Sequence, residues 1–297
     1  MSRTLFLFAL LLAPSIAWAQ PSTPDTLKTA HGWIRDLGLQ LAGSQAQYQN
    51  WQEGGIDALA VSARTDGVFY RVGGGIRQAH EVQLSLGAIK QDTLALRKAE
   101  DVARYAFGIE LDTAGSFRPS FSASAKTQFL PGYDYSPETD EYPDLPVGES
   151  GAVQVSAPFA PLFLTQSAGV VYDPGGGFTS RVGLGLKETV VTIARLRPIF
   201  GNGDDENVRV QAGLDTELRF KREVVKNVTL SSRLTAFQAF NQLGNQEPDV
   251  LFENRVRMSV NDLLNVTIDG ALLFDRDISE DVQLRQSLAV GLGFQIM

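Results

Sequence analysis

The sequence predicts an all-β protein, a transmembrane antiparallel up-and-down β-barrel of about twelve strands that follows a cleaved signal peptide. Three observations predict this fold. Apolar and polar residues alternate with a period of two over segments near the length of a tilted membrane strand, which is about 9 to 11 residues. Longer and shorter connections alternate between those segments. The first residues have the organisation of a secretory signal.

The chain begins with an export signal. Arg3 supplies a positive charge, residues 5–16 form an apolar stretch, and Ala17, Trp18 and Ala19 form a cleavage site of the small-x-small type. No later apolar run approaches the roughly 18 residues of a membrane-spanning helix. The chain has no cysteine, so strand pairing or a large core has to stabilise it after export. We expect three parts: a signal peptide over 1–19, a periplasmic segment over 20–32 and a single barrel over 33–297.

The clearest alternation covers residues 208–221, where one face is apolar and the other carries charges, amides and glycine. The last segment, 282–296, repeats this pattern. An α-helix would scatter the two sets around its axis, so both segments are predicted to be strands with an apolar face toward lipid and a polar face toward the lumen. The same alternation, with less regularity, occurs over 37–42, 81–86, 105–112, 181–187 and 266–275.

The connections support the same fold, because outer-membrane barrels have short periplasmic turns and longer outer loops. Outer loops are expected near 48–55, 90–101, 131–150, 195–207, 241–249 and 276–281, and inner turns near 71–78, 112–116, 173–177, 224–227 and 261–264. Six loops and five turns imply twelve strands with both termini in the periplasm. The least regular strand is 151–172, where Pro158 and Pro161 must lie at a bulge, an edge or a break.

The face predicted to line the lumen carries both signs of charge. Rings of charge select ions in channels, so a charged pore lining is one interpretation. An ion-pair network that plugs the lumen is the other, and both stay open because twelve strands lie between a filled eight-stranded barrel and an open sixteen-stranded one. The candidate pore residues are Arg64, Lys126, Asp215, Glu217, Arg219, Arg233, Glu253, Arg255, Arg257 and Arg285; Asp66, Glu81, Arg104, Glu110, Arg118, Lys187 and Asp269 share their face.

Charge and residue types narrow the function. The net charge of -8 would be repelled by phosphate backbones, so a nucleic acid is not expected as a partner. A Ser-His hydrolase would have to use His31 or His80, which are the chain's two histidines. The acidic loops at 134–149 and 201–207 offer oxygen ligands for Ca²⁺ but lack the spacing of an EF-hand. We therefore expect no enzymatic activity, no cofactor and no metal site.

Short motifs outside the alternating segments point to a family. The first loop contains Asn50, Trp51, Gly54 and Gly55, and further motifs cover 97–101, 126–133, 155–159 and 290–294. With these motifs the sequence resembles the domain of unknown function 3078 family, barrel-like envelope proteins of Bacteroidetes-type bacteria. The resemblance implies residence in the outer membrane and carries no catalytic residue across. In one departure from barrels that end in an aromatic residue, Phe294 is followed by three further residues.

These observations predict a non-enzymatic outer-membrane barrel, either a narrow channel for small solutes or a structural component of the envelope. Its expected partners are outer-membrane lipid, the barrel insertion machinery and small solutes. Two other functions stay open at this point. One is a barrel hydrolase that acts on lipid or peptide, and the other is a soluble periplasmic all-β binding protein.

Overall fold

The computed structural model describes residues 32–47, 57–113, 115–138, 141–242, 247–279 and 281–296. The predicted signal peptide lies outside these residues, as does all of the predicted periplasmic segment except Gly32. The described elements are β1 (Gly32–Ala46), β2 (Ala58–Gly73), β3 (Ile76–Gln91), β4 (Arg97–Leu111), β5 (Phe117–Thr127), β6 (Gly132–Asp134), β7 (Val153–Ser156), β8 (Leu162–Gly175), β9 (Phe178–Val190), the 3-10 helices η2 (Ala194–Leu196) and η3 (Pro198–Phe200), β10 (Val208–Val225), β11 (Val228–Ala239), the 3-10 helix η4 (Phe240–Gln242), β12 (Asp249–Ser259), β13 (Leu264–Phe274) and β14 (Gln283–Gln295).

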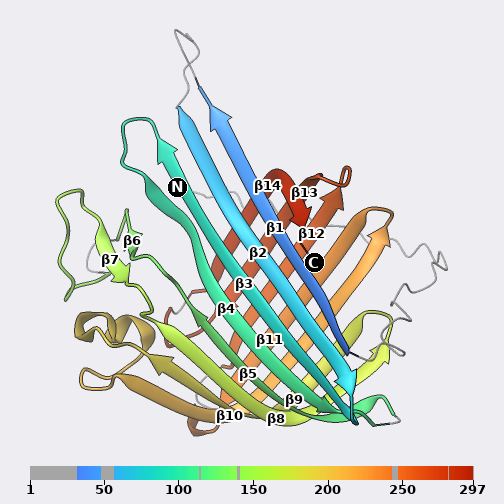
Figure 1. The fold of residues 1–297 in the computed structure, drawn as a ribbon. Coiled ribbons are helices and arrows are strands. Elements are labelled where there is room, and N and C mark those ends of the chain that lie inside the picture. The colour runs from blue at the N-terminus through green and yellow to red at the C-terminus, as the bar shows by residue number, and fades with distance from the viewer. Residues whose placement is uncertain are drawn as a thin grey trace.

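Twelve of these strands form one closed antiparallel barrel, which confirms the predicted fold class (Figure 1). Each barrel strand pairs with the next barrel strand along the chain, and β14 returns to pair with β1. The exception to strict sequence order is the step from β5 to β8, because β6 and β7 form a separate two-stranded ribbon between them. Neighbouring antiparallel strands satisfy each other's backbone groups, as a chain inside a bilayer requires.

The predicted strand over 151–172 is wrong in its first half. Residues 153–156 form β7 of the ribbon, and the barrel strand β8 begins at Leu162. Pro158 and Pro161 lie in the connection between them, where a missing backbone N–H does not interrupt the ladder. The predicted outer loop at 90–101 is also too long, because β3 continues to Gln91 and β4 begins at Arg97.

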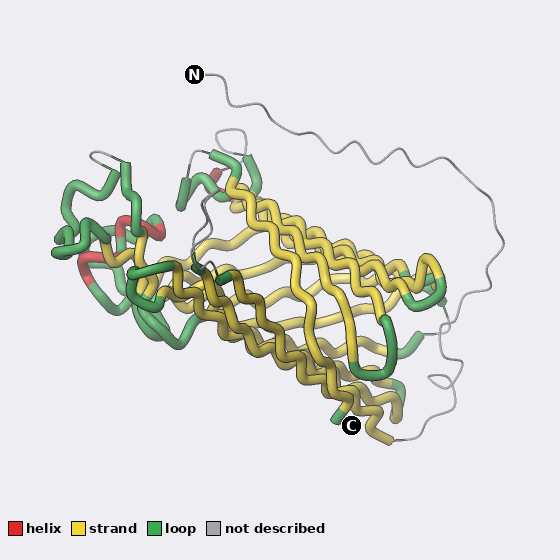
Figure 2. Tube along the Cα trace, turned by 90° about the horizontal axis from the view of Figure 1, so that it is seen from above, coloured by secondary structure: helices red, strands yellow, loops and turns green. Residues whose placement is uncertain are grey.

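The two ends of the barrel differ in their connections (Figure 2). The long connections, with the ribbon and the 3-10 helices, gather at one end, which we call the loop end. Tight connections lie at the opposite end, the turn end, such as Gly74-Gly75 between β2 and β3. The first described residue of β1 and the last residues of β14 also lie at the turn end. None of the helices in the described part of the chain is long and apolar enough to cross a membrane.

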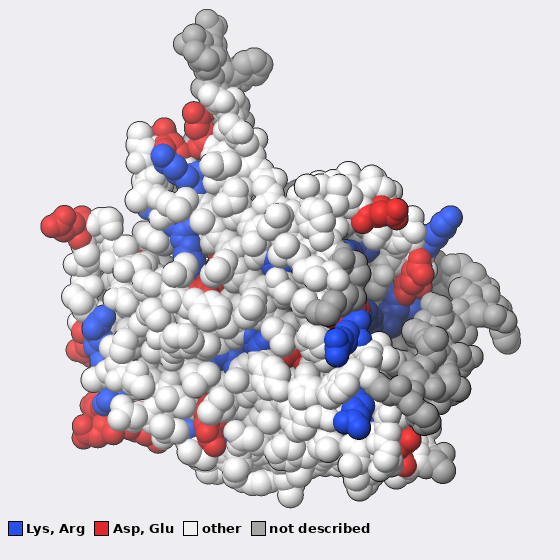
Figure 3. Space-filling model, viewed as in Figure 1, with Lys and Arg blue, Asp and Glu red and all other residues white. Residues whose placement is uncertain are grey.

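The alternation of side chains places apolar groups outside and charged groups inside the barrel. Leu214 is 43% exposed on the outer surface, whereas its neighbour Asp215 is 5% exposed on the lumen side. Few charged groups interrupt the strand surface in Figure 3, and most acidic residues of this view lie near its margins. Near the turn end the rings of Phe117 and Tyr172 stack on the outer surface with centroids 4.7 Å apart, as aromatic residues do where a barrel meets the membrane interface.

The barrel closes along a short seam. β1 and β14 pair from Gly38↔Gln295 to Ala42↔Gly291, whereas β1 and β2 pair along all of β1. At this seam a side chain on Gly291 would lie 2.4 Å from the backbone oxygen of Leu41, so glycine permits the close approach of the two strands. The seam therefore joins the middle of β1 to the last residues of β14.

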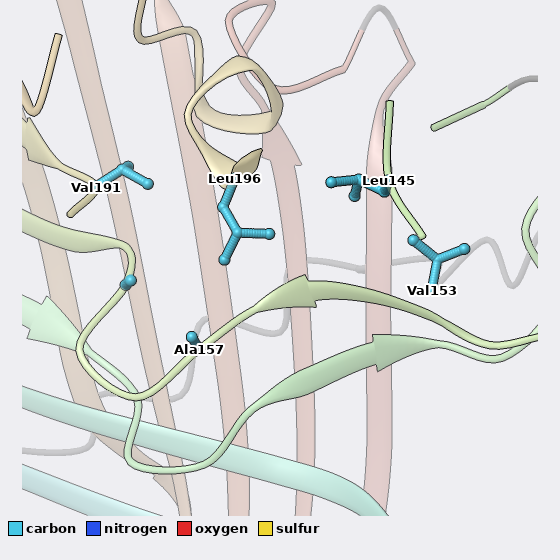
Figure 4. Packing of buried hydrophobic residues seen from close by; sticks show 6 residues of the cluster. Leu145, Val153, Ala157, Val191 and Leu196 are labelled. Carbon is cyan, nitrogen blue, oxygen red and sulfur yellow. The ribbon is translucent and has the colours of Figure 1, made fainter. Parts of the chain in front are cut away.

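Conventional apolar packing occurs in the connections at the loop end. Leu145 and Val153 lie in the connection from β5 to β8, and Val191 and Leu196 lie in the connection from β9 to β10. Val191 and Leu196 are fully buried. Figure 4 shows their side chains together with those of Leu145, Val153 and Ala157 of the same cluster. Burying apolar side chains in this way favours one arrangement of the two connections. The longest described connections thus form a small packed cap.

The face assignment predicts losses of different size when an arginine is introduced on the lipid face and on the lumen face. Leu214→Arg places a charge on the lipid side and should lower the free energy of unfolding by about 2 to 4 kcal/mol. Ser122→Arg places the same charge on the lumen wall of β5 and should lower it by less than half as much. Refolding of both variants into lipid vesicles measures this difference, and equal losses would contradict the assignment of the two faces.

Candidate functional site in the barrel lumen

The described strands turn every candidate pore residue toward the lumen. These residues come from six strands: Arg64 from β2, Lys126 from β5, Asp215, Glu217 and Arg219 from β10, Arg233 from β11, Glu253, Arg255 and Arg257 from β12, and Arg285 from β14. β3, β4 and β9 contribute Glu81, Arg104 and Lys187 to the same surface. The sequence predicted this common face, and the structure adds which of the charges meet.

Glu81 connects two opposite walls of the barrel. Its carboxylate in β3 accepts hydrogen bonds from Arg219 of β10 and from Arg233 of β11, the second at 2.8 Å. Glu217 of β10 lies 2.7 Å from the Arg219 Nε and 3.3 Å from the Arg233 Nε. Two carboxylates and two guanidinium groups therefore form a balanced network, which limits the cost of removing each charge from water.

Two further ion pairs cross the lumen. The Nη1 of Arg104 in β4 lies 3.2 Å from the Oε2 of Glu253 in β12. The Nη1 of Arg255 in β12 lies 3.5 Å from the Oδ2 of Asp66 in β2, and its Nε lies 2.6 Å from Asp269 of β13. With the Glu81 network, these contacts join the wall of β2, β3 and β4 to the wall of β10, β11 and β12. We call the three contacts together the bridging ion pairs.

Other lumen charges pair along the wall. Arg181 lies 2.7 Å from Asp215, and Arg118 lies 2.6 Å from Glu110 and 2.9 Å from Asp173. As a result, each of the following lumen carboxylates lies no farther than 3.9 Å from a lysine or arginine nitrogen: Asp66, Glu81, Glu100, Glu110, Asp173, Asp215, Glu217, Asp249, Glu253, Asp269 and Asp275.

Three lumen cations are exceptions to this pairing. Lys126, Arg257 and Arg285 are exposed, and none has a carboxylate partner among the residues that the structure describes. By contrast, the arginines of the bridging ion pairs are partly buried. The predicted pore residues therefore separate into two groups, one that is neutralised by neighbours and one that is open to solvent.

A cavity of about 320 Å³ lies beside the bridging ion pairs. Its wall includes small polar side chains of β5, such as Ser120, Ser122 and Ser124, and charged groups of β9, β10 and β12. Phe237 of β11 forms an apolar part of the wall and lies over Gly213, where a side chain would come within 2.8 Å of its ring. The small residues of the wall thus leave space that larger side chains would fill.

Three aspartates at the loop end are the described groups that most resemble a metal site. Carboxylate oxygens of Asp249, Asp275 and Asp277 all lie within 4.8 Å of one another. Lys187 donates to Asp249 at 2.6 Å and to Asp275 at 3.0 Å, and Arg209 lies 2.8 Å from Asp277. Burial alone raises the pKa of Asp277, but the hydrogen bond and charge of Arg209 outweigh it and hold this pKa below its ordinary value. The two cations already occupy the carboxylates, so the cluster is an ion-pair network.

Two of the family motifs meet at the loop end. The fully buried carboxylate of Asp101 accepts hydrogen bonds from the backbone N–H groups of Phe129 and Leu130, at 3.0 and 2.6 Å. Lys98 donates to the Gln128 side chain at 3.1 Å and to the backbone oxygen of Leu130 at 3.0 Å. Hydrogen bonds from the motif at 97–101 therefore fix the position of the motif at 126–133.

The motif at 155–159 joins the same network. The side-chain amide of Gln128 donates to the backbone oxygen of Ala157 at 3.2 Å, and the backbone oxygen of Gln128 accepts from the backbone N–H of Phe159 at 2.9 Å. The rings of Phe129 and Phe159 meet edge to face with centroids 5.9 Å apart. The first motif, with Asn50, Trp51, Gly54 and Gly55, lies outside the described residues.

His80 is on the outer surface of β3, away from the lumen. Its Nδ1 lies 2.7 Å from the Tyr105 hydroxyl and its Nε2 lies 3.0 Å from the Gln78 amide nitrogen. Trp33 and Phe107 contribute neighbouring rings. These described contacts include neither a serine nor a carboxylate, which a hydrolytic triad would need. His31 lies outside the described residues.

The sequence did not identify which charges bridge the lumen. Glu81 and Arg233 are 152 positions apart, and Arg104 and Glu253 are 149 positions apart. Alternation assigns a side chain to a face, but it says nothing about the wall that lies opposite. The aspartates at 249, 275 and 277 were also absent from the predicted site, because Asp249 and Asp277 belong to predicted outer loops and the position of Asp275 at the end of the segment 266–275 does not show that it meets them.

The chain has weak similarity to several solved structures. The translocator domain of the autotransporter NalP from Neisseria meningitidis is 12% identical, with a TM-score of 0.36 and coverage of 91% of each chain. The NanC porin is 7% identical, with a TM-score of 0.40 and coverage of 88% of this chain and 100% of that one. An outer-membrane channel from Pseudomonas putida F1 is 9% identical, with a TM-score of 0.38 and coverage of 95% and 98%. At these values the similarity concerns the fold alone.

No curated protein matches the sequence. A family model does match part of it, over a segment that runs from the end of β1 into β6 and includes the Asp101 network. The family is described as "Protein of unknown function (DUF3078)", and its model matches residues 44–133 of this chain.

Proposed function

We propose that this chain is a non-enzymatic outer-membrane barrel that conducts small hydrophilic solutes through a lumen narrowed by the bridging ion pairs. The observation that carries the proposal is the cavity of about 320 Å³ inside the barrel, whose wall includes charged and hydroxyl groups and which lies next to contacts that join opposite walls. Space next to hydroxyl and charged groups holds water, whereas the bridging side chains limit the size of the solutes that can pass.

A structural role in the envelope is the second candidate, and the same bridging ion pairs favour it. Side chains that reach from β4 to β12 and from β3 to β11 stiffen the barrel as well as narrowing it. In that case the cavity would be closed to ion flow. The two candidates differ in conductance, because both require the same folded barrel.

The chain's place in the outer membrane is part of the proposal. Apolar side chains cover the outside of the barrel and aromatic rings lie near the turn end, which suits a barrel surrounded by lipid and inserted by the barrel insertion machinery. Short turns lie at the end where the described termini are found, so both termini belong in the periplasm. We also extend the family assignment, with its envelope residence in Bacteroidetes-type bacteria, beyond the matched segment, because the 155–159 motif contacts that segment directly.

Planar-bilayer recording of purified protein tests conduction. The wild type should show small, discrete current steps. Arg104→Gln combined with Glu253→Gln removes one bridge without leaving a charge unpaired, so the barrel should remain folded and the current steps should become larger. Glu206→Gln combined with Lys226→Gln removes the same charges from exposed connections and should leave the steps unchanged. A folded wild type that carries no current would contradict the channel and support the structural role.

Insertion of a protease site tests the orientation. A site inserted at Asp204, in the connection at the loop end, should be cut on intact cells. A site at Gly176, in the tight turn between β8 and β9, should be cut only after the outer membrane is opened. The reverse pattern would place the termini outside and invert the proposed topology.

A further inference from the structure

The charges of the lumen wall do not cancel. Each lumen carboxylate named above has a basic partner, whereas the exposed side chains of Lys126, Arg257 and Arg285 have no acidic partner among the residues described. Lys221 and Glu223 are both exposed at the turn-end mouth, just beyond the last residue pair of β9 and β10, so that mouth carries both signs of charge. Among the lumen groups named above, those without an ion-pair partner are therefore cations, although the whole chain carries a net charge of -8.

The unpaired cations occupy two levels of the lumen. Lys126 is next to the last residue of β5 at the loop end, and Arg285 is near the start of β14 at the same end. Lys126 is the register partner of Arg104 in β4, and Arg285 is in register with Glu253 through Ala271 of β13. Since Arg104 and Glu253 neutralise each other at 3.2 Å, Lys126 and Arg285 remain as two free cations on either side of one bridge.

Arg257 lies nearer the turn end. A side chain on Gly293 would lie 3.1 Å from its Nη2, so Arg257 is beside the short seam between β1 and β14. A solute that passes the bridging ion pairs therefore meets two free cations near the loop end of the lumen and one, Arg257, near the turn end. Unpaired charges inside a protein are stable only when water or a counterion accompanies them.

We propose that the lumen binds and selects small anions, such as phosphate and carboxylates, with Lys126 and Arg285 as the first site from the loop end. The proposal rests on the proposed function, because selection during transport requires conduction. The ligand class follows from the side chains: a lysine ammonium and an arginine guanidinium supply several hydrogen-bond donors and no acceptor, which suits phosphate and carboxylate oxygens.

The test compares Lys126→Gln combined with Arg285→Gln against wild type. The substitutions leave no carboxylate without its partner, so the barrel should fold as the wild type does. Lys226→Gln, in the exposed turn between β10 and β11, removes a cation outside the lumen and is the matched control.

Reversal potentials in a potassium chloride gradient give the first readout. The wild type and the Lys226→Gln control should both prefer chloride over potassium. In the double variant, the ratio of chloride to potassium permeability should fall about fivefold, as expected when fixed charges that act on a passing ion are removed. A cation-selective wild type, or an unchanged ratio in the double variant, would overturn the proposal.

Binding of inorganic phosphate to detergent-solubilised barrel gives a second readout that does not require conduction. Calorimetry should detect saturable binding by the wild type and by the control, and loss of at least tenfold in affinity in the double variant. If the wild type carries no current but binds phosphate through these residues, the channel function fails and the anion site stands. If it conducts without phosphate binding or anion preference, the anion site fails and the channel function stands.

Discussion

Contact between charged side chains of opposite walls determines what this barrel can do. Glu81 holds Arg219 and Arg233 from the far wall, and Arg104 meets Glu253 at 3.2 Å. A barrel of twelve strands is wider than one whose lumen is filled by side chains alone, so its interior has to be narrowed by long residues that reach across. Arginine and glutamate have that reach, and each pair offsets the cost of taking the other's charge from water.

The cavity, the seam and the loop-end cap are arranged around the bridging ion pairs. Small residues on β5 leave a cavity beside the bridges instead of a solid interior, and Gly213 on β10 makes room for the ring of Phe237 in its wall. The seam between β1 and β14 is short and joins the middle of β1 to the end of β14, whereas the packed cap and the Asp101 network order the loop end. The bridging pairs lie between these two regions and join walls that no backbone ladder connects directly.

The sequence was sufficient for the architecture because each barrel strand must present two different faces to two different solvents. The alternation over 208–221 predicted β10, and Leu214 and Asp215 do point to opposite sides. The same reasoning failed at 151–172, where the apolar residues before Pro158 pack in the cap and not against lipid. Alternation reports that one side of a segment is apolar, but it does not distinguish a membrane from a neighbouring loop.

The candidate site could be predicted only as a set of residues on one face. Arg255 and Arg257 are equivalent in the sequence, two positions apart on the same strand, yet Arg255 binds Asp269 and Asp66 while Arg257 is exposed without an acidic partner among the described residues. This difference depends on the opposite wall and on strand register, which bring together residues about half the chain apart. The lumen charges therefore form two groups: ion-paired charges that connect the walls, and unpaired charges that can contact a solute.

A double-mutant cycle on Arg104 and Glu253 tests the bridging contacts most directly. The free energy of unfolding is measured in lipid vesicles for Arg104→Gln, for Glu253→Gln and for the two changes together, and Arg104→Gln with the exposed Glu206→Gln serves as the additive control. Residues in direct contact across the lumen should show a coupling energy of about 0.5 to 3 kcal/mol, with the double variant more stable than the sum of the single losses implies. A coupling energy indistinguishable from that of the control pair would mean that the walls are not joined and would contradict the account of a narrowed lumen.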